Sequence, residues 1–206
     1  MKDKNIPKTN SPRLEERISA QVRRLRDERG LSLDQLSQSC GVSRSMLSLI
    51  ERAEASPTAT VLEKIATGLG VALASLFEPT AVEPSSIQVL ARASKQETWR
   101  DPASGYTRRN VSPPHELGGE AAPVQIVEVK FPAQARVMYE GAIRSAQGVQ
   151  VHQQIWLLAG QMQITLGNAV FDLKAGDCLA HRLDRPITYH NPGTQTARYA
   201  VVISKS

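Results

Sequence analysis

The sequence predicts two domains of different fold class, an α-helical domain followed by a β domain. Up to residue 78, apolar residues recur at three- and four-residue spacing, which is the period of amphipathic helices. From residue 87 the pattern changes to short alternating runs separated by Gly, Asn or Pro, which is typical of an all-β sandwich or barrel. We therefore expect four segments: a basic arm over 1–13, a helical domain over 14–78, a Pro- and Ser-containing linker over 79–86 and a β domain over 87–206.

The first two helices are indicated by their apolar stripes and end signals. The first helix is stopped by Gly30 and carries a stripe formed by Leu14, Ile18, Val22 and Leu25. The second helix begins after Ser32, because Ser32 and Gln35 have the spacing of a capping box. It ends at Gly41, since glycine tolerates the left-handed conformation that turns the chain after a helix.

A third helix follows the second after a short turn. Ser43 is its predicted N-cap, and Leu47 and Ile50 are its predicted buried positions. The outward face of its first turns therefore consists of Arg44, Ser45, Met46 and Ser48. This arrangement is the pattern of a helix-turn-helix, in which the outward face of the second helix meets base edges in the major groove of DNA.

Two further helices complete the helical domain. Thr58 or Thr60 caps a fourth helix whose apolar residues continue to Leu69. A short fifth helix is predicted over residues 73–77. Five helices in about 65 residues can close a small hydrophobic core.

Residues 14–78 resemble the DNA-binding domain of the XRE-type (phage-repressor-like) transcriptional regulators. The tract over 42–77 carries the resemblance and follows the family pattern almost position by position. One departure is Ala53, which stands where the family usually has Gly after Glu-Arg. Either Ala53 ends the third helix with a positive φ, at a cost of about 1 kcal/mol relative to Gly, or the helix ends elsewhere.

The resemblance implies which residues contact DNA. Arg44 is expected to make a bidentate contact to guanine, and its neighbours read adjacent base edges: Ser45, Met46 and Ser48. Phosphate or positioning contacts are expected from Ser32, Gln35, Ser43 and Arg52. Residues 1–30 hold nine Lys and Arg against five Asp and Glu, a balance of +4, which fits a phosphate-contacting element. A solvated charged helix face would give the same balance.

The β domain resembles a cupin, which is a double-stranded β-barrel or jelly-roll fold. The resemblance rests on the spacing of two motifs, which is kept by Gly141, Gly160, Gly176 and Asn191. The positions of the family's metal ligands instead hold Gln147, Val149, Gln153 and Ile187. A divalent metal needs three or four converging imidazole, carboxylate or thiolate groups, so we expect neither a metal nor another cofactor. The alternative is a rearranged metal site formed by His152, His181 and His190.

Strand alternation predicts which residues face the inside of the barrel. If the positions of the family's metal ligands face the inside of the barrel, the same face holds Val151, Ile155, Leu157 and Tyr189. The predicted ligand pocket would suit a neutral or anionic organic metabolite, with help from Arg136 or Arg144, and consists of Gln147, Val149, Gln153, His181, Ile187 and Tyr189. The alternative is a barrel filled by its own side chains. Trp156 falls on the other face, where we expect it between the sheets or at a dimer interface.

These features together predict a one-component transcriptional regulator rather than an enzyme. The helical domain would bind operator double-stranded DNA, and the barrel would form a homodimer and bind a small-molecule effector. Two alternatives remain: a metal-dependent cupin enzyme fused to a DNA-binding domain, and a barrel that only dimerises. The sequence contains no run of about 18 apolar residues and no apolar leader, so we expect a cytoplasmic protein with no membrane partner. Cys40 and Cys178 are expected to be buried free thiols.

Overall fold

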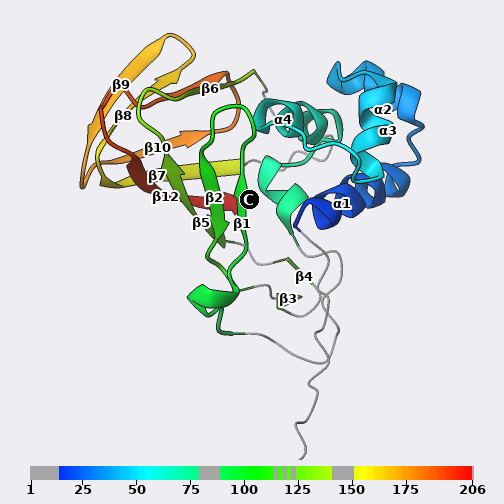
Figure 1. The fold of residues 1–206 in the computed structure, drawn as a ribbon, viewed down its shortest axis with the longest axis horizontal. Helices are drawn as coiled ribbons and strands as arrows, with labels where there is room; N and C mark the ends of the chain where they lie inside the picture. Colours follow the sequence, from blue (N-terminus) through cyan, green and yellow to red (C-terminus); the bar gives the residue numbers. More distant parts are fainter. Residues whose placement is uncertain are drawn as a thin grey trace, which may run out of the picture.

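The computed structural model describes residues 14–78, 89–113, 116–117, 120–121, 124–140 and 151–205. In this part of the chain, a helical domain lies beside a β barrel made of two sheets (Figure 1). The predicted fold class, α and β in separate domains, is confirmed. Several predictions concern positions outside the described residues: the arm over 1–13, the linker over 79–86, and the pocket residues Arg144, Gln147 and Val149.

Four α-helices and one 3₁₀-helix form the helical domain: α1 (Leu14–Glu28), α2 (Leu33–Cys40), α3 (Arg44–Glu51), α4 (Ala59–Gly68) and η1 (Leu73–Phe77). The fifth predicted helix is thus a 3₁₀-helix rather than an α-helix. All five elements contribute fully buried side chains to one core: Val22, Leu36, Leu47, Ile50, Leu62, Ile65 and Leu76. None of the described helices is long and apolar enough to cross a membrane.

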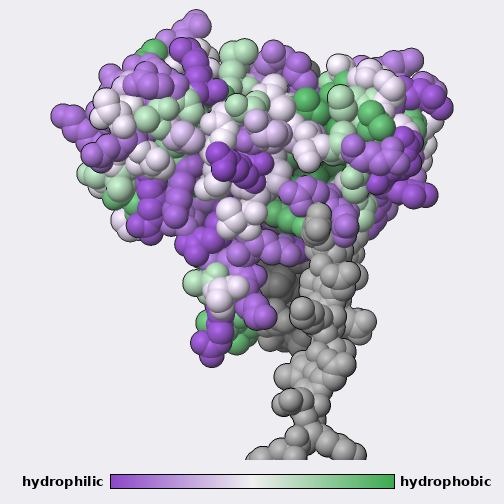
Figure 2. All heavy atoms as spheres, viewed as in Figure 1, coloured by the Kyte–Doolittle hydropathy of each residue, from purple (hydrophilic) through white to green (hydrophobic). Residues whose placement is uncertain are grey.

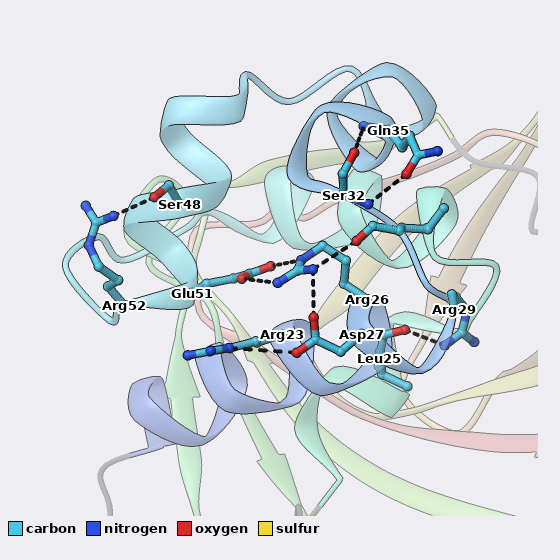
Figure 3. A network of polar contacts seen from close by, with 11 residues as sticks. Arg23, Leu25, Arg26, Asp27, Arg29, Ser32, Gln35, Ser48, Glu51 and Arg52 are labelled. Carbon is cyan, nitrogen blue, oxygen red and sulfur yellow. Dashed lines mark hydrogen bonds and ion pairs between the residues drawn. The ribbon is translucent and has the colours of Figure 1, made fainter.

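The predicted caps of α2, α3 and α4 are confirmed. At the start of α2, the Ser32 N–H donates to Gln35 Oε1 at 2.8 Å and the Gln35 N–H donates to Ser32 Oγ at 3.2 Å, which completes the capping box (Figure 3). Gly41 ends the helix with a φ of 67°. Ser43 caps α3, and Thr58 rather than Thr60 caps α4. The turn of the helix-turn-helix is therefore fixed at both ends by local hydrogen bonds.

The third helix ends in a left-handed residue that is not glycine. Ala53 has a φ of 56°. Its N–H donates to the Ile50 carbonyl at 3.0 Å, and the Glu54 N–H donates to the Leu49 carbonyl at 2.9 Å. This pair of bonds is a Schellman motif, so the first of the two alternatives for Ala53 is the one observed. The alanine at this position costs about 1 kcal/mol relative to glycine.

The β domain consists of two antiparallel sheets that face each other. The six-stranded sheet has the order β1-β2-β5-β12-β7-β10, with the bounds Thr98–Arg100, Thr107–Asn110, Val124–Phe131, Ala197–Lys205, Val151–Ala159 and Cys178–Arg182. The four-stranded sheet has the order β6-β11-β8-β9, with the bounds Arg136–Tyr139, Ile187–His190, Gln161–Leu166 and Ala169–Lys174. The remaining described elements are β3 (Glu116–Leu117), β4 (Glu120–Ala121) and the 3₁₀-turn η2 (Ala93–Lys95). Because the chain passes repeatedly from one sheet to the other, the sheets close a jelly-roll barrel of the cupin type.

The two faces of the large sheet differ as strand alternation predicts. Val151, Ile155, Leu157 and Tyr189 are buried inside the barrel, as expected. Trp156 points outward and is 51% exposed, so in this chain it does not pack between the sheets. The free thiol of Cys178 is also exposed, opposite Trp156 in the register, so the expectation of a buried thiol is wrong for Cys178 and right for Cys40. Strand alternation predicts which face of the sheet a residue lies on, but it does not predict whether another part of the chain covers that face.

The helical domain packs on the barrel through α4, which contacts β6, through α1, which contacts β1, and through Phe77 of η1 (Figure 1). The carboxylate of Asp101, which is buried after β1, accepts a hydrogen bond at 2.9 Å from the N–H of Ala59, the first residue of α4. A carboxylate at this end also complements the helix dipole. Phe77 of η1 lies edge-on to Trp99 of β1, with ring centroids 5.5 Å apart. Hydrophilic side chains cover most of the face shown in Figure 2, where hydrophobic ones appear in small separate patches.

Candidate DNA interface and interdomain cavity

The first turn of α3 presents the predicted base-reading residues to solvent. Arg44, Ser45 and Met46 are exposed, whereas Leu47 and Ile50 are fully buried on the opposite side. A helix that buries one side in a small domain and exposes its N-terminal residues has the form of a recognition helix. The geometry therefore allows this turn to approach a DNA groove.

Arg44 takes part in an exposed ion pair between the two helices of the motif. Its Nε lies 3.3 Å from Oδ1 of Asp34 on α2, and the two side chains are 65% and 67% exposed. Pairs of this kind contribute about 0–1 kcal/mol to stability. The guanidinium can thus leave Asp34 for another acceptor at little cost.

The other predicted contact residues lie around the same turn. Ser32 and Gln35 are exposed in the capping box of α2, and Ser43 Oγ lies 3.2 Å from Ser45 Oγ. Arg52 contacts Ser48 one turn along α3 (Figure 3). These side chains are held by local hydrogen bonds beside the recognition helix.

Arg52 also pairs with an acidic neighbour. Its Nε and Nη2 donate to the two carboxylate oxygens of Glu54 at 2.9 and 2.8 Å. These hydrogen bonds lower the pKa of Glu54 and raise the pKa of Arg52. Arg52 is therefore held alongside the end of α3 in this structure.

A largely buried ion pair fixes the recognition helix against α1. Arg26 Nε and Nη2 donate to the carboxylate oxygens of Glu51 at 2.6 and 2.8 Å, and Arg26 Nη1 donates to the Leu31 carbonyl at 2.9 Å (Figure 3). The Arg26 and Glu51 side chains are 13% and 8% exposed. The hydrogen bonds to Glu51 raise the pKa of Arg26. One guanidinium thus joins α1, the end of α3 and the chain that enters α2.

A cavity of about 90 Å³ lies where the helical domain meets the barrel. The helical domain contributes six residues to its lining: Glu63, Ala66, Thr67, Val71, Leu73 and Ala74. The barrel contributes aliphatic side chains, one arginine and five aromatic residues. The arginine is Arg108, and the aromatic residues are Tyr106, Phe131, Tyr139, Tyr189 and Tyr199. A molecule bound in this cavity would touch both domains.

The cavity includes half of the predicted pocket residues. Gln153, Ile187 and Tyr189 line it. His181 does not line this cavity. It lies in shallow depressions on another part of the barrel. Burial lowers the pKa of His181, whose Nε2 has no hydrogen-bond partner among the described residues. Arg136 is exposed on β6.

The tyrosines of the cavity are neutral groups. The hydroxyl oxygens of Tyr106 and Tyr139 are 3.0 Å apart and share a hydrogen bond. Burial raises the pKa of Tyr106 to about 12 and raises the pKa values of Tyr139, Tyr189 and Tyr199 as well. None of the four side chains therefore supplies a negative charge near neutral pH.

Arg108 is the buried cation of the cavity. The residue is 9% exposed, and its Nε has no hydrogen-bond partner among the described residues. The guanidinium carbon lies 4.4 Å from the centre of the Phe77 ring, which belongs to the helical domain. Burial lowers the pKa of Arg108, although an arginine remains protonated at neutral pH.

The barrel does not fit the metal of the cupin family. Ile187 stands at one of the family's ligand positions, and its hydrocarbon side chain cannot bind a metal. Gln153 at another position offers only an amide, which is a weak ligand. Within the described ranges, no three His, Cys, Asp or Glu side chains gather to form a metal site.

The sequence prediction of the pocket missed Arg108 and the contribution of the helical domain. Residues 107–110 are all polar, so no alternation of apolar and polar residues shows whether Arg108 or Arg109 faces inward. Tyr106 provides the one usable signal, because residues two apart share a face of a strand and Tyr106 is a large aromatic residue.

A family model and two known regulators are similar to the helical part of this chain. The helix-turn-helix family model matches residues 22–76. The HTH-type transcriptional regulator SutR of Escherichia coli (strain K12) is 47% identical over 62 residues, which are 30% of this chain and 35% of that protein. The uncharacterized HTH-type transcriptional regulator y4dJ of Sinorhizobium fredii (strain NBRC 101917 / NGR234) is 34% identical over 67 residues, which are 32% of this chain and 87% of that protein.

The similarity to a solved structure extends over both domains. The crystal structure of an HTH_3 family transcriptional regulator from Vibrio cholerae superposes with a TM-score of 0.68 at 27% identity, and the match covers 93% of this chain and 96% of that one. The match to SutR, by contrast, spans only about a third of that protein. The chain belongs to the XRE-type (HTH_3) family of helix-turn-helix transcriptional regulators and joins their DNA-binding domain to a cupin-like barrel.

Proposed function

We propose that this regulator binds an operator through the exposed face of α3, as a homodimer, and that a small molecule in the barrel controls its binding. The observation that carries the proposal is the exposed first turn of α3 on a helix that the Arg26–Glu51 pair holds in place. Arg44 reads a guanine, and Ser45, Met46 and Ser48 read neighbouring bases. Ser32, Gln35, Ser43 and Arg52 hold or position the phosphate backbone.

The test is operator selection with the full chain from a library of random DNA duplexes. We expect one sequence to be enriched, and we expect two related half-sites about one helical turn apart because each domain offers few base contacts. Recovery of unrelated sequences, with an affinity that depends only on salt, would overturn the proposal of specific operator binding.

The exposed outer face of the large sheet supports a homodimer. Trp156 is half-exposed and lies between Cys178 and Ala200 in the register of the sheet, so a large flat side chain is flanked by small ones. A face of this kind suits pairing with a second copy. Sedimentation equilibrium should find a dimer for the wild-type chain and a monomer for Trp156→Glu. The matched control is Val170→Glu, at an equally exposed apolar residue of β9, which should remain dimeric. A monomeric wild type would contradict the proposal.

The interdomain cavity supports control by a small molecule. It is lined by both domains, so a ligand that prefers one relative placement of the domains would shift the population toward it. A thermal-shift screen of metabolites, repeated with operator DNA, is the appropriate test, because a true ligand stabilises the folded chain by mass action. If no metabolite shifts the midpoint, the barrel serves only for dimerisation.

We assign the barrel a sensing role rather than a catalytic one. The carbon side chain of Ile187 at a family ligand position supports this assignment. Elemental analysis of the purified chain provides the check. Stoichiometric iron, manganese or zinc would contradict the assignment and favour a metal-dependent enzyme.

A further inference from the structure

We propose that Arg108 is the receptor for a small organic monoanion, such as a short carboxylate, which binds in the cavity between the two domains. The inference rests on the proposed function, because it names the chemical class of the effector. It concerns a residue on β2, outside the positions at which the cupin family binds metal. Four observations support it: the absence of an ion-pair partner among the described residues, the neutral tyrosines around the guanidinium, the size of the cavity and the contact to the helical domain.

Among the described residues, Arg108 has no anionic partner of the kind that a buried cation needs. Burial of a charge is strongly unfavourable unless an opposite charge and hydrogen bonds compensate it. No ion pair of the described residues includes Arg108, whereas its neighbour Arg109 pairs with Glu128 on the other face of the strand. The Nε–H of Arg108 is buried with no acceptor among the described residues. The Phe77 ring at 4.4 Å offers only a cation–π contact.

The tyrosines around Arg108 do not supply the missing negative charge, and no ion pair of the described residues joins Arg108 to Glu63, the carboxyl group that lines the same cavity. The tyrosines that line the cavity with it are buried and protonated near neutral pH. A guanidinium presents a planar fork of N–H donors, which matches the two oxygens of a carboxylate. An anion that enters the cavity would therefore find a donor fork and a charge to pair with.

The cavity limits the size and charge of this anion. Its volume of about 90 Å³ is well below the ~300–1,000 Å³ of sites for drug-sized ligands, so the molecule is short. Aliphatic and aromatic side chains such as Phe131 and Ile187 favour an apolar body. Glu63 of α4 lines the same cavity, so a second carboxylate on the ligand would enter a site that already holds a carboxyl group. A monoanion with a short hydrocarbon or aromatic body meets these conditions.

The position of Arg108 connects the anion to the DNA-binding domain. The guanidinium rests on Phe77, and Phe77 packs against Trp99 at the junction of the domains. An anion that draws the guanidinium into the cavity changes this contact and so changes the relative stability of the two domain placements. Anion and operator should then alter each other's affinity by the same factor.

The test uses thermal unfolding of the full chain with paired probes of equal shape. Butyrate and benzoate are compared with butyramide and benzamide at equal concentration, and sodium chloride keeps the ionic strength constant. We expect the carboxylates, but not the amides, to raise the unfolding midpoint. Arg108→Met should weaken carboxylate binding roughly tenfold or more, which is the loss expected for a charge-assisted hydrogen bond. Arg108→Lys keeps the charge without the fork and should retain only part of the shift.

Two further comparisons separate binding from folding. Arg108→Met should raise the midpoint of the ligand-free chain, because it removes an unpaired buried charge. Arg109→Met, the same change on the outer face of β2, should leave the carboxylate shift intact. Equal shifts from amides and carboxylates, no shift from any probe, or a full shift in Arg108→Met would overturn the inference. If the wild type still binds its operator in those cases, the inference fails alone, whereas loss of operator binding overturns the proposed function.

Discussion

The recognition helix and the interdomain cavity hold their arginines in opposite ways. Arg44 is exposed and shares a surface ion pair with Asp34, whereas Arg108 is buried and its Nε has no acceptor among the described residues. The surface pair is screened by water and salt, so Arg44 can exchange its partner at little cost. A buried cation responds far more strongly to a new partner. The first arrangement suits reversible contacts to DNA, and the second suits selection of one anion.

The largest expected effect concerns the support of the recognition helix. Glu51→Gln removes the carboxylate that accepts two hydrogen bonds from the largely buried Arg26 and leaves the more exposed Asp27 as its ion-pair partner. We expect the free energy of unfolding to fall by about 2–3 kcal/mol, somewhat less than for a fully buried pair because this one lies near the surface. Chemical denaturation measures the change. Glu54→Gln, at the exposed partner of Arg52, is the control and should leave the denaturation midpoint unchanged. Equal effects at the two positions would show that α3 does not depend on the buried pair.

A smaller effect is expected on the cavity side of the comparison. Phe77→Leu removes the ring under Arg108 and its edge contact to Trp99. The loss of packing and of the cation–π contact should reduce the free energy of unfolding by about 1–2 kcal/mol. Phe171→Leu, at a phenylalanine of β9 that is 38% exposed, provides the control and should have a smaller effect. If Phe77→Leu left the free energy of unfolding unchanged, the ring would not contribute to holding the two domains together.

The smallest effect is expected at the end of the recognition helix. Ala53→Gly relieves a left-handed alanine and should stabilise the chain by up to about 1 kcal/mol. Operator affinity should not change, because the substitution leaves the outward face of α3 intact. Ala103→Gly is the same substitution at an exposed position without a positive φ, and it should not stabilise the chain. Destabilisation by Ala53→Gly would contradict the assignment of the Schellman motif.

Local signals predicted the recognition helix well. The Ser32–Gln35 capping box, the left-handed Gly41 and the cap at Ser43 are determined within a few residues, so the sequence alone places the turn. The Arg26–Glu51 pair could not be predicted in this way, because it joins residues 25 apart through the packing of α1 on α3. The exposed surface of α3 was thus predictable, whereas its support was not.

The cavity was predictable only in part, for a related reason. Strand alternation correctly placed Tyr189 and Ile155 on the inner face. It could not show that α4 and η1 pack on the barrel, which brings Glu63 to the cavity and Phe77 to the guanidinium of Arg108. Arg108 becomes notable only when the helical domain and the barrel are seen together. Tertiary packing, rather than any local pattern, creates its environment.

The measurement that tests the central claim most directly is the operator preference of Arg44→Ala. Fluorescence anisotropy would compare the selected operator with single-base variants, for the wild type and for the mutant. We predict that Arg44→Ala loses about 1–3 kcal/mol of discrimination at one guanine while thermal unfolding stays unchanged. Arg185→Ala, at an exposed arginine of the barrel, should retain full discrimination. An unchanged preference of Arg44→Ala among the variants would contradict the account that the exposed turn of α3 reads the operator.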